Sequence, residues 1–210
     1  MPGPFHLPKL YAILDVACFV PAPGSPAFIV AYACELAAGG VTLLQYRSKL
    51  GTTREMLSDA RAIRSALGER ATLIMNDRAD ICVASGYDGV HLGQDDLSPE
   101  GARLVVGTRL VGISAHNSQQ VKEADASPAD YIAIGPVFPT TGKKNPDELV
   151  GLKGVSAARA ATRKPLVAIG GITRSRAKSV IEAGADSVAV ISDLLSSPRQ
   201  AAEEFLRLLV

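Results

Sequence analysis

The stretch TLIMNDRADICVASGYDGVHLGQDD, residues 72–96, contains the unit from which the fold can be predicted. It opens with the apolar run Thr72–Asn76, passes through a helix-like segment that ends at Gly86, and closes with the run Gly89–Leu92. Both runs are nearly continuous rather than alternating, which is typical of strands covered on both faces, as in parallel sheets. The stretch therefore predicts a strand–helix–strand unit.

Similar units repeat along all 210 residues. The predicted strands are Leu10–Leu14, Thr42–Tyr46, Thr72–Asn76, Gly89–Leu92, Leu110–Ser114, Tyr131–Ile134, Leu166–Ile169 and Ser187–Ile191. Eight strands that alternate with about eight helices predict an α/β fold, a (β/α)8 TIM barrel, as a single domain over residues 1–210. A doubly wound open sheet is the alternative.

Local signals place several helix ends. A helix over Thr53–Leu67 is expected to begin after a Thr52 or Thr53 cap, with Glu55 in its first turn. Pro99 suits a first helical position. The remaining predicted helices include Ala27–Ala38, Ser118–Ala124, Val155–Ala161, Ser175–Ala183 and Arg199–Leu209.

The composition excludes several functional classes. The net charge is +1 without a basic or acidic block, which argues against nucleic acid and membrane partners. No apolar run approaches the roughly 20 residues that span a bilayer, and the first nine residues show no signal-peptide pattern, so a cytoplasmic protein is expected. Three widely spaced cysteines argue against a disulfide framework. The composition leaves open whether the protein forms a homo-oligomer.

Polar side chains follow the predicted strands, where a barrel of this kind places its active site. Arg47 and Lys49 are separated by one residue and face the same side if the chain is extended, as a phosphate site would require. Two solvated cations are the alternative. Asp77 and Asp96 follow neighbouring strands and predict a Mg²⁺ that bridges a pyrophosphate, with Asp95 as a competing ligand and helix capping as the alternative role.

A second anion site is predicted after the last two strands. Gly171 and the pair Ile191 and Ser192 lie in the loops that form a recurrent phosphate site in barrels, although Gly171 could simply serve a turn. Lys143 and Lys144 lie in the long loop Pro136–Gly151, which could close over an anion or carry solubilising charge.

Amide and imidazole groups complete the set. Gln45 and Asn76 can each donate and accept, which suits a heteroaromatic amine or ring nitrogen, although they could equally satisfy strand-end backbone groups. His91 and His116 also end strands. Ligand contact or hydrogen bonding is expected for them rather than metal ligation, because the HxH and HxxxH spacings are absent. Ser114 near His116 is poor evidence for a hydrolase.

Taken together, these motifs resemble the thiamine phosphate synthase family. The matching segments run in family order over nearly the whole chain and are Gln45–Lys49, Asn76–Arg78, Asp88–Asp96, Gly112–His116, Gly135–Thr140, Gly170–Ile172 and Gly184–Ser187. The resemblance implies a transferase that joins 4-amino-5-hydroxymethyl-2-methylpyrimidine diphosphate to a thiazole phosphate, often its carboxylated form. The products are thiamine phosphate and pyrophosphate.

The resemblance also implies roles for individual residues. Asp77 and Asp96 would hold Mg²⁺, and Arg47, Lys49, Ser114 and Lys143 would act on the departing pyrophosphate. The implied pyrimidine diphosphate contacts are Gln45, Tyr46, Arg47, Ser48, Lys49, Asn76, His91, Ser114 and Lys143. The implied thiazole phosphate contacts are Thr140, Thr141, Gly142, Gly171, Ile191 and Ser192.

One segment departs from the family pattern, and two rival functions stand beside the synthase. The family commonly has Thr-x-Thr-Lys where this chain has Thr140–Lys143, so Thr141 or the backbone N–H of Gly142 would replace the second hydroxyl. The rivals are a thiazole tautomerase, in which His116 would act as acid or base, and a non-catalytic phospholigand-binding barrel. His91, Gln94 and Asp96 favour the synthase.

Overall fold

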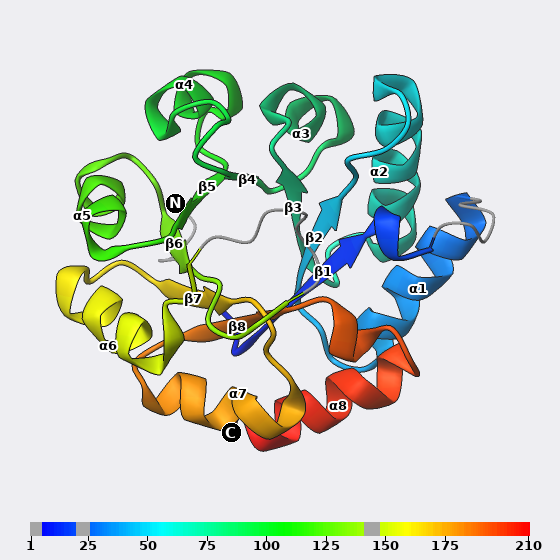
Figure 1. Cartoon of the computed structure of the whole chain (residues 1–210). Helices are drawn as coiled ribbons and strands as arrows, with labels where there is room; N and C mark the ends of the chain where they lie inside the picture. The colour runs from blue at the N-terminus through cyan, green and yellow to red at the C-terminus, as the bar shows by residue number, and fades with distance from the viewer. Residues whose placement is uncertain (1–5, 20–25, 141–147) are drawn as a thin grey trace.

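The computed structural model describes residues 6–19, 26–140 and 148–210. Eight parallel strands close into a barrel in chain order, with β8 paired to β1 (Figure 1). The strands are β1 Leu10–Asp15, β2 Leu43–Arg47, β3 Thr72–Asn76, β4 Gly89–Leu92, β5 Leu110–Ala115, β6 Tyr131–Ile134, β7 Leu166–Ile169 and β8 Ser187–Val190. The predicted barrel is confirmed with strand ends within one residue, and the open-sheet alternative is wrong.

Helices surround this barrel on the outside (Figure 1). They are α1 Pro26–Ala38, α2 Thr53–Leu67, α3 Ala79–Ser85, α4 Pro99–Val106, α5 Ser118–Ala126, α6 Gly151–Ala161, α7 Arg174–Glu182 and α8 Pro198–Leu208, with short 3-10 turns η1 Val16–Phe19 and η2 Ser192–Leu194. Thr52 caps α2 in a capping box with Glu55. In the part of the chain that the structure describes, no helix is long and apolar enough to cross a membrane.

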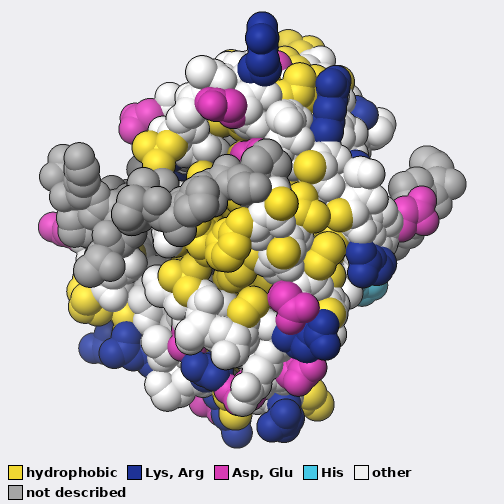
Figure 2. All heavy atoms as spheres, turned by 90° about the vertical axis from the view of Figure 1, so that its right-hand side faces the viewer, with side chains coloured by type: hydrophobic (Ala, Val, Ile, Leu, Met, Phe, Trp, Pro, Cys, Tyr) yellow, Lys and Arg dark blue, Asp and Glu magenta, His cyan; other side chains and the backbone are white. Residues whose placement is uncertain are grey.

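The face formed by α1 is unusually apolar for an outer helix. Hydrophobic side chains gather on this side of the molecule (Figure 2). Within α1, Phe28 is 47% exposed. Phe19 of η1 packs edge-on against Phe28 and Tyr32, with ring centroids 5.2 and 5.0 Å away. These aromatic contacts fix η1, which follows β1, against α1.

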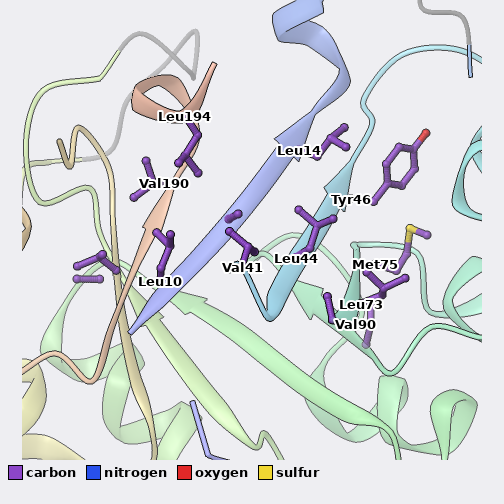
Figure 3. Close-up of a cluster of buried hydrophobic side chains, with 14 of the residues drawn as sticks. Leu10, Leu14, Val41, Leu44, Tyr46, Leu73, Met75, Val90, Val190 and Leu194 are labelled. Atoms are coloured by element: carbon purple, nitrogen blue, oxygen red, sulfur yellow. The ribbon is translucent and has the colours of Figure 1, made fainter. Parts of the chain in front are cut away.

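Two apolar layers hold the barrel together. The larger layer fills the space between strands and helices, and Figure 3 shows part of it, including Leu44, Tyr46 and Met75. The smaller layer lies inside the barrel and includes Tyr11 and Tyr131. Because successive strand residues point to opposite faces, a residue either joins the helix layer or points into the barrel. This parity decides which strand residues can reach the site.

A repeated ion pair ties the helices to the amino ends of the strands. In each case an arginine near the end of a helix binds an aspartate that precedes a strand, and the aspartate accepts a backbone N–H from the neighbouring strand. The three sets are Arg64–Asp88–Leu73, Arg103–Asp130–Val111 and Arg159–Asp186–Leu166. Each aspartate is therefore a clamp between α2, α4 or α6 and two strands.

Loss of one clamp should destabilise the fold measurably. In Asp130→Ala, the Arg103 guanidinium and the Val111 N–H lose acceptors at 2.6 and 2.7 Å, so we expect the free energy of unfolding to fall by about 2 kcal/mol. Urea denaturation measures it. The control is Glu35→Ala, which removes an exposed ion pair with Arg199 and should cost less than about 1 kcal/mol. Equal losses in the two variants would contradict the clamp.

Candidate active site

The predicted cations Arg47 and Lys49 lie at the carboxyl end of β2, and each is paired with an acid. The Arg47 guanidinium donates to Asp15, the last residue of β1, which is only 5% exposed. Asp15 also accepts the backbone N–H of Ala17 at 3.1 Å. A buried carboxylate with two donors is a rigid support, so the Arg47 guanidinium is held in place at the end of β2.

Lys49 leads to the carboxylate pair that was predicted to hold a metal. Its ammonium donates to Asp77, which has a left-handed backbone with φ 62°. Burial raises the pKa of Asp77, the Lys49 ammonium opposes that shift, and the adjacent Asp96 carboxylate raises the pKa further. The two predicted carboxylates are thus brought together. Asp96 accepts the backbone N–H of Gly93 at 2.7 Å, which holds its loop in place.

A chain of hydrogen bonds crosses the barrel interior below these charges. Gln45 Nε2 donates to the Tyr11 hydroxyl at 2.8 Å, and that hydroxyl lies 3.0 Å from the Tyr131 hydroxyl. The Tyr131 hydroxyl lies 3.1 Å from His91 Nδ1, and His91 Nε2 lies 2.9 Å from Ser114 Oγ. Three residues predicted for the site are therefore linked through two tyrosines that sequence reasoning did not select.

Asn76 contributes a buried donor at the end of β3. Its side-chain Nδ2 is buried without a hydrogen-bond partner among the described residues. Asn76 pairs in register with His91 of β4, so the amide lies beside the interior chain. An unsatisfied buried N–H costs about 1–3 kcal/mol, and a ligand acceptor would relieve that cost.

The opposite side of the barrel mouth is formed by backbone. Gly171 has φ 60°, and a Cβ there would lie 2.4 Å from the Pro139 carbonyl oxygen. The close approach brings the end of β7 against the segment that follows β6, next to Thr140. Ile191 and Ser192 join β8 to η2, so both predicted loops reach this side. The predicted residues Thr141, Gly142, Lys143 and Lys144 lie outside the described residues.

Not every predicted contact residue faces the site. The Tyr46 side chain points into the helix layer, where its hydroxyl donates to Asp59 of α2 at 2.9 Å, so only its backbone borders the mouth (Figure 3). Ser48 donates locally to the carbonyl of Leu50 at 2.9 Å. His116 lies with Nδ1 2.6 Å from the Gly135 carbonyl oxygen, which ties β5 to β6.

Comparison with known proteins identifies the family. Residues 17–194 match the family model described as thiamine monophosphate synthase. The chain belongs to this family. It is 59% identical to the thiamine-phosphate synthase of Koribacter versatilis over 100% of this chain and 99% of that protein. It is 44% identical to the thiamine-phosphate synthase of Agrobacterium fabrum over 88% of this chain and 84% of that protein.

A solved structure supports the same conclusion. Thiamine phosphate pyrophosphorylase from Pyrococcus furiosus superposes with a TM-score of 0.85 and 32% identity, over 96% of this chain and 95% of that one. The resemblance inferred from the strand-end motifs is confirmed. As a member of the thiamine monophosphate synthase family, the chain is a transferase that joins pyrimidine and thiazole moieties into thiamine phosphate. The tautomerase and non-catalytic alternatives find no support.

The buried His91 should make stability depend on pH. Burial lowers the pKa of His91 from 6.5 to about 4, with a smaller opposing effect of Asp96. Between these values the unfolded chain binds a proton that the folded chain does not, so stability falls as pH drops from 6.5 to 4. The maximum contribution is about 3 kcal/mol.

Urea denaturation of wild type and His91→Gln at pH 7, 6, 5 and 4 measures this contribution. We expect the variant to be less stable at pH 7, because two hydrogen bonds are altered. Its free energy of unfolding should then fall about 3 kcal/mol less than that of wild type on acidification. Parallel curves for the two proteins would show that His91 does not carry the linkage.

Proposed function

We propose that the carboxyl ends of β2–β5 bind the pyrimidine diphosphate and that the ends of β6–β8 bind the thiazole phosphate. The observation that best supports this division is the carboxylate pair Asp77 and Asp96, which lies beside Lys49 on the β2–β5 side. Two adjacent carboxylates repel each other, and a bound metal ion would relieve that repulsion while joining them to a polyanion. The backbone-lined side opposite suits a single phosphate.

The carboxylate pair fits Mg²⁺ bound together with a diphosphate. Over residues 6–19, 26–140 and 148–210, no group of three or more His, Cys, Asp or Glu side chains could hold a metal. Two carboxylates are nevertheless what Mg²⁺ commonly takes when phosphate oxygens and water complete its octahedron. When bound, the ion would neutralise negative charge on the departing pyrophosphate. We therefore propose Asp77 and Asp96 as its ligands.

Polar groups below the metal pair are proposed to recognise the pyrimidine ring. Gln45 and Ser114 end the interior hydrogen-bond chain, and Asn76 offers a buried donor without a partner among the described residues. His91 Nε2 lies 2.9 Å from Ser114 Oγ and supports that hydroxyl. A heteroaromatic amine with ring nitrogens supplies the donor and acceptors that these groups need.

The proposed reaction needs no protein nucleophile. Arg47 and Lys49, with Lys143 from outside the described residues, stabilise the charge that builds on the diphosphate while the C–O bond to the pyrimidine methylene breaks. The bond electrons leave with the diphosphate, and the electron-rich aminopyrimidine carries the positive charge. The thiazole nitrogen then donates its pair to form the C–N bond. Asp15 keeps Arg47 in position for this role.

The thiazole phosphate is proposed to lie against the ends of β6, β7 and β8. Gly171 allows backbone to approach the ligand, while Thr140 and Ser192 supply hydroxyls near it. Asp193, next to Ser192, is paired with Arg174, which also binds Glu204. This pairing removes an acidic charge that would otherwise repel a phosphate. Ile191, Thr141 and Gly142 complete the proposed contacts.

Single carboxamide substitutions test the metal assignment. Asp77→Asn and Asp96→Asn should each lower kcat at least about a hundredfold, because each removes a charged Mg²⁺ ligand with little change in shape. The assay follows thiamine phosphate formed from pyrimidine diphosphate, thiazole phosphate and varied Mg²⁺. Asp95→Asn is the matched control and should retain wild-type activity. Full turnover of Asp77→Asn at saturating Mg²⁺ would overturn the assignment.

A further inference from the structure

The hydrogen-bond chain inside the barrel has ends of different chemical character. It runs from Gln45 through Tyr11, Tyr131 and His91 to Ser114, and its inner members are buried. At the first end, Gln45 uses its amide nitrogen, which can only donate. The Tyr11 oxygen is therefore an acceptor there.

The other directions follow from the requirement that each buried hydroxyl hydrogen meets an acceptor among these contacts, because Gln45 Nε2 cannot accept the Tyr11 hydrogen. The Tyr11 hydroxyl has one hydrogen, and it points to the Tyr131 oxygen at 3.0 Å. The Tyr131 hydrogen points in turn to His91 Nδ1, which must be bare to accept it. The ring proton of a neutral imidazole then resides on Nε2 and is donated to Ser114 Oγ at 2.9 Å.

We infer that this one-way chain sets which ends of Gln45 and Ser114 the substrate meets. With Nε2 engaged, Gln45 presents Oε1, an acceptor without a hydrogen-bond partner among residues that the structure describes. With its oxygen already accepting from His91, Ser114 presents its O–H as a donor. Tyr11, Tyr131 and His91 are positioning residues, and the inference rests on the proposed function for the identity of the ligand.

Packing of the aromatic rings holds the hydrogen-bond chain in place. The Tyr131 ring stacks on His91 with centroids 5.5 Å apart and meets Tyr11 edge-on at 6.0 Å. Gly112 leaves the space for this ring, since a Cβ there would lie 2.1 Å from Tyr131 Cζ. Both rings belong to the apolar layer inside the barrel, so each hydroxyl has little choice of direction.

The direction of the hydrogen-bond chain determines which donors and acceptors the ligand must have. An amino group at the ring position that faces Gln45 can donate to Oε1, whereas a carbonyl oxygen there would face another acceptor. A diphosphate oxygen or an unprotonated ring nitrogen accepts from Ser114. The site should therefore bind a 4-aminopyrimidine diphosphate and reject its 4-oxo analogue, because an unpaired buried acceptor is costly.

The first test reads the hydrogen positions directly, without substrate. Nitrogen NMR of ¹⁵N-histidine-labelled full-length protein at neutral pH should show His91 with the proton on Nε2 and a bare Nδ1. Tyr131→Phe keeps the ring but removes the donor to Nδ1, so the Nδ1-protonated form of His91 should appear. A wild-type His91 with its proton on Nδ1, or on both nitrogens, would overturn the inference.

The second test measures how the protein recognises the pyrimidine ligand. Tyr11→Phe and Tyr131→Phe should each weaken binding of the aminopyrimidine diphosphate about tenfold and reduce the preference over the 4-oxo analogue, as for one lost hydrogen bond. Titration calorimetry with both ligands measures this. Tyr87→Phe is the control, because its buried hydroxyl has no partner within the described ranges. It should bind as wild type does.

The outcomes separate this inference from the proposed function. If wild type binds neither pyrimidine, the proposed substrate is wrong, while the NMR spectrum still decides the direction of the chain. If wild type binds the amino form but both Phe variants keep wild-type affinity and preference, the positioning role is overturned. Circular dichroism and urea midpoints of the Phe variants show whether a change in affinity arises from misfolding.

Discussion

The hydrogen bond between the Tyr11 and Tyr131 hydroxyls joins two strands that are not neighbours in the barrel, β1 and β6, and the interior hydrogen-bond chain is built on it. Both rings belong to the apolar interior layer, while their hydroxyls begin the polar part of the interior. A polar group in such a place costs free energy when it lacks a hydrogen-bond partner. The two tyrosine hydroxyls are partners for each other, and they also hold the side chains of Gln45 and His91 in place.

The rim above this interior is governed by charge pairing rather than by packing. Arg47 and Lys49 are both bound to acids, but in different settings. Asp15 is buried and has a backbone donor as well, so its pair with Arg47 is a fixed support. The Lys49 side chain is 51% exposed, and a pair in that setting is weak. Under the proposed function, Lys49 would therefore exchange Asp77 for a substrate phosphate at little cost.

Much of this was predictable because parallel strands bring their carboxyl ends together. Apolar runs predicted the strands within one residue, and residues after those runs included Arg47, Lys49, Asp77 and Asp96. Tyr11 and Tyr131 could not be selected from the sequence because they lie within nearly continuous apolar runs. In strands that are covered on both faces, polar and apolar residues do not alternate, so the sequence does not show which residues point into the barrel. Parity along β2 does separate Gln45 and Arg47 from Tyr46, which the family resemblance had placed with them.

The opening motif also contained a residue of another kind. Asp88 directly precedes β4 and binds Arg64. It therefore lies at the amino end of the barrel, whereas the site lies at the carboxyl end. The same clamp recurs before β6 and β8 but not, among the described residues, before β2, where Thr42 stands. Between β1 and β2, the acid that ties the two strands together is Asp15, at the carboxyl end of β1. One ion pair there both links β1 to β2 and holds Arg47 in place.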